Sequence, residues 1–314
     1  MTTTSMDTMT AMPDAATDKR TSTRRRLPKL GVTFGVLWLG TLIFLAVFSD
    51  LLPFIRRYGT SLNGAENARF GPGVDFWFGS DTLGRDVFAR CVYGARTSLT
   101  IASASILVGT VVGGTLGMIA GYFKGWVDRV ISIFTDSLLA LPAIIIASLL
   151  VGRFDVLAAS DIQFLGFGFG WMSRTWSVTI VFSLLSIAPV ARIVRAQTLS
   201  LSQREYVLAA RSLGASTRRV LWREILPNVI PALTAVIFTG IAILLAAEGG
   251  LAFLGYSVPK PPSWGSMIAD DRDKIEEAWW TSIFPCFMLF FTVLAFNLIG
   301  DRLARRFDIR EAAL

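Results

Sequence analysis

The segment EYVLAARSLGASTRRVLWREILPNVIPAL, residues 205–233, is charged and contains a glycine, although long apolar runs lie on both sides of it. Residues 203–213 place apolar side chains three, four or seven positions apart, which predicts a short amphipathic helix. Gly214 can stop this helix in a left-handed conformation at low cost. The Ser-Thr pair at 216–217 can cap a second helix, and Pro227 cannot continue its hydrogen-bond ladder. We therefore predict a rigid helix–turn–helix between two apolar segments.

The rest of the chain has the composition of an integral membrane protein. It is 53% hydrophobic and 17% charged, whereas a typical soluble domain is about 25% charged. A helix needs about 20 mostly apolar residues to cross about 30 Å of hydrocarbon, and only helices or closed barrels can span it. Six blocks reach this length: 31–52, 99–122, 130–151, 175–194, 230–254 and 279–299. We therefore predict an all-α integral membrane protein with six transmembrane helices.

The first apolar block follows a basic stretch and could instead be a secretory signal peptide. It is 22 residues long, longer than the apolar core of about 7–15 residues that signal peptides carry, and no small-residue cleavage site follows it. We expect it to be retained as the first span. Residues 1–30 have no apolar periodicity before this block and are expected to form a disordered basic tail.

The distribution of Lys and Arg predicts how the chain lies in the membrane. With six spans, the side that holds both termini, residues 123–129 and residues 195–229 carries 18 Lys and Arg, against 11 on the other side. The positive-inside rule then places both termini and the 205–227 loop in the cytoplasm of a multi-pass cell-membrane protein. The net charge of +7 reflects this topology and contact with membrane lipid. It forms no single patch for nucleic acid.

Several catalytic and metal-binding residues are missing from the sequence. There is no histidine, and the two cysteines, Cys91 and Cys286, have no neighbouring metal ligands. His-ligated metal sites and Ser-His triads are thereby excluded. No GxxxxGK[ST] motif for ATP is present either. We expect no catalytic residue, no metal site and no cofactor in this chain.

Two carboxylates fall within predicted spans, Asp136 and Glu248. An acid inside the membrane is costly and is a functional candidate by default. It would serve a proton-coupled secondary transporter, which is the alternative function that the sequence allows. In the structural interpretation, which we favour, both acids face the bundle interior and bond to hydroxyls or backbone near helix breaks. Pro142 and the pair Gly249-Gly250 make such breaks plausible.

A membrane-bound enzyme is a third possible class of protein, and it would need a polar cluster near an interface. The best cluster is Asp81, Arg85 and Asp86. Its spacing more simply predicts a helix start with a capping residue and an Asp86–Arg90 pair one turn apart. A purely structural membrane subunit would leave the charged 205–227 loop without a role.

The 205–227 loop resembles the EAA loop of ABC-importer permeases. Ala209-Ala210 are followed by three residues, Gly214, nine residues (215–223) and then Glu224-Ile225-Leu226-Pro227, which is the spacing of that motif. Leu208 and Glu224 depart from the general motif, and the acid at Glu205 is similar to the dipeptide/oligopeptide/nickel branch. Three further stretches resemble the C-type subunits of that branch: FGSDTLGRDVFARCVYGARTSL (78–99), DSLLALPAIIIA (136–147) and EGGLAFLGYSVPKPPSWGSMI (248–268).

This resemblance implies a type I ABC-importer permease fold and a mechanical role. Residues 31–98 would hold the first span and an outer loop, residues 99–300 the importer transmembrane domain with a coupling loop at 196–229, and residues 301–314 a cytoplasmic tail. The first helix of the loop would dock, as a coupling helix, on a cytoplasmic ATP-binding subunit. The residues implied for that contact are Glu205, Tyr206, Ala209, Ala210, Arg211, Gly214 and Arg218.

The resemblance also implies an assembly. Its partners would be two ATP-binding subunits that carry ATP and Mg, a second homologous permease subunit in a heterodimer, and an extracytoplasmic substrate-binding protein. This chain would form half of the translocation pathway, working by alternating access. Di- or oligopeptides, nickel chelates, glutathione and other small solutes all stay open as substrates.

Overall fold

A computed structural model describes residues 29–57, 59, 68–159, 163–164, 167–168, 173–256 and 258–311. Nearly all of the predicted N-terminal tail, residues 1–28, lies outside this part. Most of the described chain is helical, and the longest described non-helical stretch is 68–86. One antiparallel pair of two-residue strands, β1 (Gln163–Phe164) and β2 (Phe167–Gly168), accompanies the helices.

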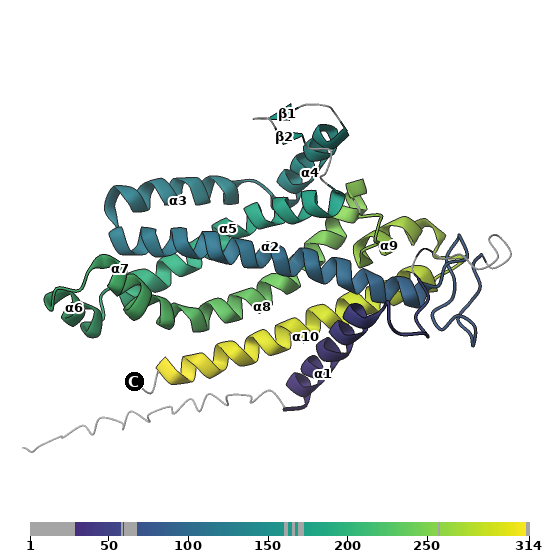
Figure 1. The fold of residues 1–314 in the computed structure, drawn as a ribbon, viewed down its shortest axis with the longest axis horizontal. Helices are drawn as coiled ribbons and strands as arrows, with labels where there is room; N and C mark the ends of the chain where they lie inside the picture. Colours follow the sequence, from purple (N-terminus) through teal and green to yellow (C-terminus); the bar gives the residue numbers. More distant parts are fainter. Residues whose placement is uncertain are drawn as a thin grey trace, which may run out of the picture.

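Five helices in the described part are long and apolar enough to cross a membrane. They are α1 (Lys29–Phe48), α2 (Val87–Phe123), α5 (Arg174–Leu201), α8 (Leu226–Leu251) and α10 (Trp280–Glu311). They lie side by side as a bundle (Figure 1). The predicted all-α membrane fold is confirmed.

The block predicted as one span at 130–151 is instead two helices. α3 (Gly125–Ala140) and α4 (Ala143–Ala159) are bent by 89° at the break between them, and together they can count as the sixth span. The sequence made a break near Pro142 plausible, and the structure has it there, because Pro142 disfavours a helical conformation at the residue before it. Leu141 is accordingly extended, with φ −100° and ψ 145°. α3 lies along the bundle, and α4 turns away from it and leads to the strand pair (Figure 1).

The second span begins much earlier than its apolar block. α2 starts at Val87, whereas the hydropathy of the sequence places the span at 99–122. The first turns of the helix contain polar side chains, among them Arg90, Thr97 and Ser98, and all three are buried against the rest of the chain. A hydropathy average misses such a segment, because it counts every polar side chain as unfavourable even where other parts of the protein bury it.

α2 packs against α5 through a row of glycines. They recur at every fourth position: Gly109, Gly113, Gly117 and Gly121. A Cβ added at Gly113 would lie 2.5 Å from the carbonyl oxygen of Ile187, and one at Gly117 would lie 2.4 Å from that of Ala191. These distances leave no room for any side chain. The two backbones are therefore in direct contact, as small residues allow in membrane helix pairs.

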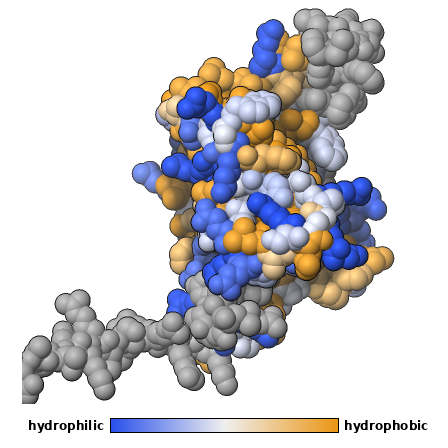
Figure 2. All heavy atoms as spheres, turned by 90° about the vertical axis from the view of Figure 1, so that its left-hand side faces the viewer, coloured by the Kyte–Doolittle hydropathy of each residue, from blue (hydrophilic) through white to orange (hydrophobic). Residues whose placement is uncertain are grey.

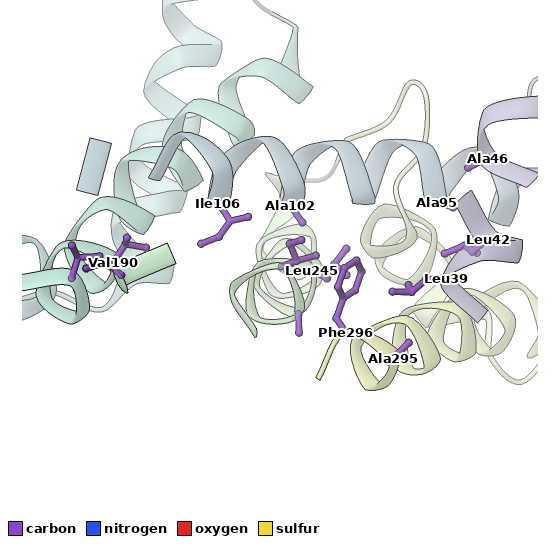
Figure 3. Close-up of a cluster of buried hydrophobic side chains, with 14 of the residues drawn as sticks. Leu39, Leu42, Ala46, Ala95, Ala102, Ile106, Val190, Leu245, Ala295 and Phe296 are labelled. Atoms are coloured by element: carbon purple, nitrogen blue, oxygen red, sulfur yellow. The ribbon is translucent and has the colours of Figure 1, made fainter. Parts of the chain in front are cut away.

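The main hydrophobic cluster joins the other long helices to this pair. Ala102 and Ile106 of α2 meet Leu245 of α8, and Phe296 of α10 and Leu39 of α1 extend the cluster (Figure 3). Trp38 of α1 also donates a hydrogen bond from Nε1 to Oγ1 of Thr292 on α10, at 3.1 Å. α1 is thus attached to α10 by both apolar and polar contacts.

Short elements lie at the two ends of the bundle. α6 (Glu205–Ser212) and α7 (Thr217–Arg219) are at one end, which we call the α6 end, and α10 finishes on that side too (Figure 1). α9 (Trp264–Asp271) and the turn η4 (Arg272–Lys274) are at the opposite end, the α9 end. Figure 2 looks onto the α6 end, where hydrophilic and hydrophobic side chains are interspersed.

The glycine row predicts that substitution by alanine affects stability differently at two nearby positions of α2, Gly117 and Gly114. Gly117→Ala should lower the free energy of unfolding by about 1–3 kcal/mol, because its Cβ must push α5 away. Gly114→Ala is the matched control, since nothing lies within 4 Å of a Cβ there and alanine favours helix over glycine by about 1 kcal/mol. Thermal unfolding of the detergent-solubilised protein measures both. Equal melting temperatures would contradict the direct backbone contact.

Candidate functional site

α6 is anchored to the bundle by one buried side chain. Val207 is 0% exposed and belongs to the same apolar cluster as Val220, Ile225 and Val229, which precede or begin α8. The helix ends at Ser212, and Gly214 has φ +81°. The predicted first helix and its left-handed glycine stop are therefore confirmed.

The second part of the loop differs from the prediction of a separate helix. Ser216 caps α7 as expected, since its Oγ accepts a hydrogen bond from the backbone N–H of Arg219. The chain then continues through a π-helical turn, η2 (Val220–Ile225), directly into α8. Pro227 does not end a helix, because it falls in the first turn of α8, where a missing N–H is tolerated. Residues Thr217–Leu251 thus form one continuous helical stretch.

Most of the residues implied for partner contact lie on the surface of the α6 end. Glu205, Tyr206, Ala209, Arg211, Gly214 and Arg218 are exposed, and Ala210 is half-buried. Leu213, at the end of α6, is 88% exposed. Within the described part of the chain, no ion pair or hydrogen bond is formed by the side chains of Glu205 and Arg218. The outer side of α6 therefore combines small, apolar and charged groups.

Two polar contacts tie α6 to long helices, and the sequence did not predict either of them. The guanidinium of Arg211 lies 4.5 Å from the ring centroid of Tyr122, near the end of α2. Asn228 Nδ2 of α8 donates to Tyr206 Oη at 3.3 Å and to the Glu224 carbonyl oxygen at 2.6 Å. Tyr122 was missed because nothing in a single sequence links it to residue 211.

Asp136 is on the surface of this chain and not in the bundle interior, so the expected interior position is wrong for it. It borders a small cavity of about 120 Å³ between α3 and α5, which Arg192, Arg195 and Ser132 also line. Arg195 is paired with Asp128, with Nη2 of the guanidinium 2.6 Å from Oδ2. α3 lies on the outside of the α2–α5 pair, and this position exposes Asp136.

Glu248 is buried, as the structural interpretation predicts. The residue is 3% exposed, and Oε1 of its carboxyl accepts a hydrogen bond of 2.5 Å from the Ser263 hydroxyl. The break expected at Gly249-Gly250 is not there, because α8 runs on to Leu251. The chain turns instead at Gly255, which has φ +89° within η3 (Ala252–Tyr256). Ser263, the partner of Glu248, was not singled out by the sequence.

The polar cluster at the α9 end is a helix start with ion pairs. Asp86 caps α2 and accepts from the N–H of Phe88 at 2.9 Å, as predicted. The predicted Asp86–Arg90 pair is wrong: Arg90 Nε lies 3.6 Å from Asp81 Oδ2, because the carboxylate of Asp86 is directed to backbone donors. Burial raises the pKa of Asp86, and its two backbone bonds and Arg56 oppose this effect. Among the described residues, no group of His, Cys, Asp and Glu could hold a metal ion.

An apolar cavity of about 570 Å³ opens among α4, α5 and α8. Its wall is mostly aliphatic and aromatic, with Ile144, Ala147, Phe182, Leu185, Ile243 and Leu244 among the lining residues. Ser186 and Thr239 are the hydroxyl groups of this lining, and Asp301 of α10 is its charged residue. The cavity therefore offers space for a solute but few groups that could select it by charge.

Residues 113–312 match the family of binding-protein-dependent transport system inner membrane components. The chain belongs to this family. It is therefore a permease subunit of an ABC importer and a multi-pass membrane protein, and a proton-coupled secondary transporter is not favoured.

Relatives extend the match over most of this permease. It is 35% identical to the dipeptide transport system permease protein DppC of Alkalihalophilus pseudofirmus, over 87% of this chain and 84% of that protein. It is 37% identical to the glutathione transport system permease protein GsiD of Pectobacterium atrosepticum, over 76% and 74%. The oligopeptide transport system permease protein OppC of Bacillus subtilis is 32% identical, over 91% and 87%.

A solved structure supports the fold of the permease. A crystal structure of an amino acid ABC transporter with histidines aligns with a TM-score of 0.52 at 15% sequence identity. The alignment covers 70% of this chain and 94% of the other. At this identity the likeness concerns the fold alone.

The contact between Arg211 and Tyr122 predicts a measurable coupling between α6 and α2. In a double-mutant cycle of Arg211→Gln and Tyr122→Leu, the free energies of unfolding should be non-additive by about 0.5–1 kcal/mol, the worth of an exposed cation–π contact. Tyr122→Phe should keep most of this coupling, because it keeps the ring face. Arg218→Gln is the matched control, and its cycle with Tyr122→Leu should be additive. Additivity at Arg211 as well would contradict the contact.

Proposed function

We propose that this permease imports peptides or a related small solute and forms half of the translocation pathway. The names of its relatives, which include dipeptide, oligopeptide and glutathione transport, support this substrate class. The largely apolar cavity among α4, α5 and α8 fits a path for solutes with varied side chains. Selection among such solutes then falls mainly to an extracytoplasmic binding protein.

We further propose that α6 docks on an ATP-binding subunit. The observation that carries this proposal is the contrast between the two sides of α6. Val207 is buried and fixes the inner side of the helix, whereas Glu205 and Ala209 are exposed on its outer side. An element that transmits force needs both a rigid attachment and a free surface. Arg211 serves the attachment through Tyr122, and Arg218 stays available for an ion pair with the partner, worth little if exposed.

The proposed assembly contains two ATP-binding subunits, this chain and a second homologous permease subunit in a heterodimer. ATP and Mg would be bound by the ATP-binding subunits, and this chain would carry no catalytic residue and no cofactor. The α6 end and both termini would face the cytoplasm, with residues 196–229 as the coupling loop of the 99–300 transmembrane domain. The α9 end would then face the binding protein.

The docking role of α6 is tested in the complete complex reconstituted in lipid vesicles. Ala209→Arg should reduce both binding-protein-stimulated ATP hydrolysis and solute uptake by about tenfold or more, as expected for a central interface position. Ala209 is exposed, so the change should leave the melting temperature of the isolated permease unaltered. Gly214→Val should have a similar effect, because φ +81° disfavours a branched side chain.

Two controls make this test specific. Arg302→Glu changes an exposed charge near the end of α10, outside the coupling loop, and should leave hydrolysis and uptake near wild-type values. Gly214→Asn should be tolerated better than valine, since asparagine adopts the left-handed conformation more readily. Wild-type uptake in both Ala209→Arg and Gly214→Val would refute the docking role.

A further inference from the structure

The N-terminal turn of α9 is inserted between α2 and α8. Trp264 is 0% exposed, its backbone N–H donates to Ser98 Oγ at 3.1 Å, and its indole Nε1 donates to the Cys91 carbonyl oxygen at 2.9 Å. A Cβ at Gly94 would lie 3.0 Å from the indole ring. α9 is therefore held on the α2 side by two hydrogen bonds and a close contact.

Glu248 holds α9 on its other side. Ser263 Oγ donates to Glu248 Oε1 at 2.5 Å and also accepts from the N–H of Ser266 at 3.0 Å, as the cap of α9. One hydroxyl thus joins the cap of α9 to α8. A Cβ at Gly265 would lie 2.8 Å from Glu248 Oε2, so the carboxyl and the α9 backbone are packed without a gap.

α8 connects this anchor to the α6 end without interruption. α8 itself has 26 residues, which is about 39 Å at 1.5 Å per residue, and η2 and α7 continue it without a break back to Thr217. Its first part packs against Val207 of α6, and Glu248 near its other end bonds to the cap of α9. Beyond α9, the exposed residues Asp270 and Asp273 belong to an acidic surface segment, 270–277.

We propose that Glu248 is a positioning residue that makes α9 move together with α8. Through this hydrogen bond, a protein that presses on the α9 end shifts the same helix whose other end carries α6. The inference rests on the proposed function, because it supplies the link between a binding protein outside and an ATP-binding subunit inside. This positioning role requires that Oε1 of Glu248 accepts a hydrogen bond, and it does not require that Glu248 takes up or releases a proton.

The test compares three variants in the complete complex in lipid vesicles. Glu248→Ala and Ser263→Ala each remove one partner of the bond. Both should lower the stimulation of ATP hydrolysis by the binding protein about threefold to tenfold, the range for one lost buried hydrogen bond, while hydrolysis without binding protein stays near wild type. Glu248→Gln keeps an acceptor for Ser263 and should retain most of the stimulation. Uptake should follow the stimulated hydrolysis.

Ser282→Ala is the control, because Ser282 is a buried hydroxyl of α10 for which no hydrogen-bond partner is found in the described chain. In this variant, the stimulation of ATP hydrolysis by the binding protein should equal that of the wild type. The proposal is overturned if Glu248→Gln loses as much stimulation as Glu248→Ala, which would point to a charge or proton role. It is also overturned if Ser263→Ala keeps full stimulation, or if both alanine variants lose basal and stimulated hydrolysis in parallel, as a purely structural role predicts.

These outcomes are distinct from a failure of the proposed function. If the wild-type complex shows no hydrolysis coupled to uptake, the importer role itself fails before any variant is compared. If wild-type stimulation is normal and Ala209→Arg abolishes it while Glu248→Ala does not, the docking of α6 stands and the α9 link is refuted.

Discussion

The direct contact between the backbones of α2 and α5 is the constraint on which the bundle depends. Between membrane helices there is little hydrophobic driving force, so association relies on close packing and hydrogen bonds. The row of glycines supplies the close packing. A buried hydrogen bond from Ser105 Oγ to the Thr179 carbonyl oxygen, at 3.0 Å, links the two helices as well. α3 is attached to this pair through Asp128 and Arg195, and α8 packs on α2. A wider spacing of α2 and α5 would disturb all of these contacts.

The two ends of the bundle are attached in the same way, each to α2 and to α8. At the α6 end, Tyr122 of α2 contacts Arg211 and Asn228 of α8 contacts Tyr206. At the α9 end, α2 bonds to Trp264 through Ser98 and Cys91, and α8 bonds to Ser263 through Glu248. Any displacement of α2 relative to α8 must therefore strain both ends at once. This double attachment gives a physical basis for communication across the membrane that needs no separate signalling element.

The sequence was sufficient for features that single residues or blocks determine. Apolar blocks located the spans, the left-handed glycine at 214 ended α6, and the spacing of the coupling loop pointed to the family that the comparison with known proteins established. The early start of α2 was missed, because a hydropathy average ignores the burial of polar groups by neighbouring helices. A break at Pro142 was plausible from the sequence, but the size of its bend, 89°, was not predictable from it. The contact of Arg211 joins it to Tyr122, far away in the chain, and the contact of Glu248 joins it to Ser263 across a turn between two helices. One sequence contains no information on such pairs.

The two acids in predicted spans, Asp136 and Glu248, show how much the role of a carboxylate depends on the residues that the fold places beside it. In sequence Asp136 and Glu248 look equivalent, and each could serve a proton-coupled carrier. In the structure Asp136 lies on the surface beside Arg192 and Arg195, whereas Glu248 accepts a hydrogen bond from Ser263, the residue fifteen positions later that caps α9. The Ser263 hydroxyl also accepts a hydrogen bond from the backbone N–H of Ser266 in the first turn of α9. The proton of this hydroxyl is therefore directed to Oε1 of Glu248. A proton at that oxygen would oppose this bond, and holding α9 is therefore a different task from carrying a proton.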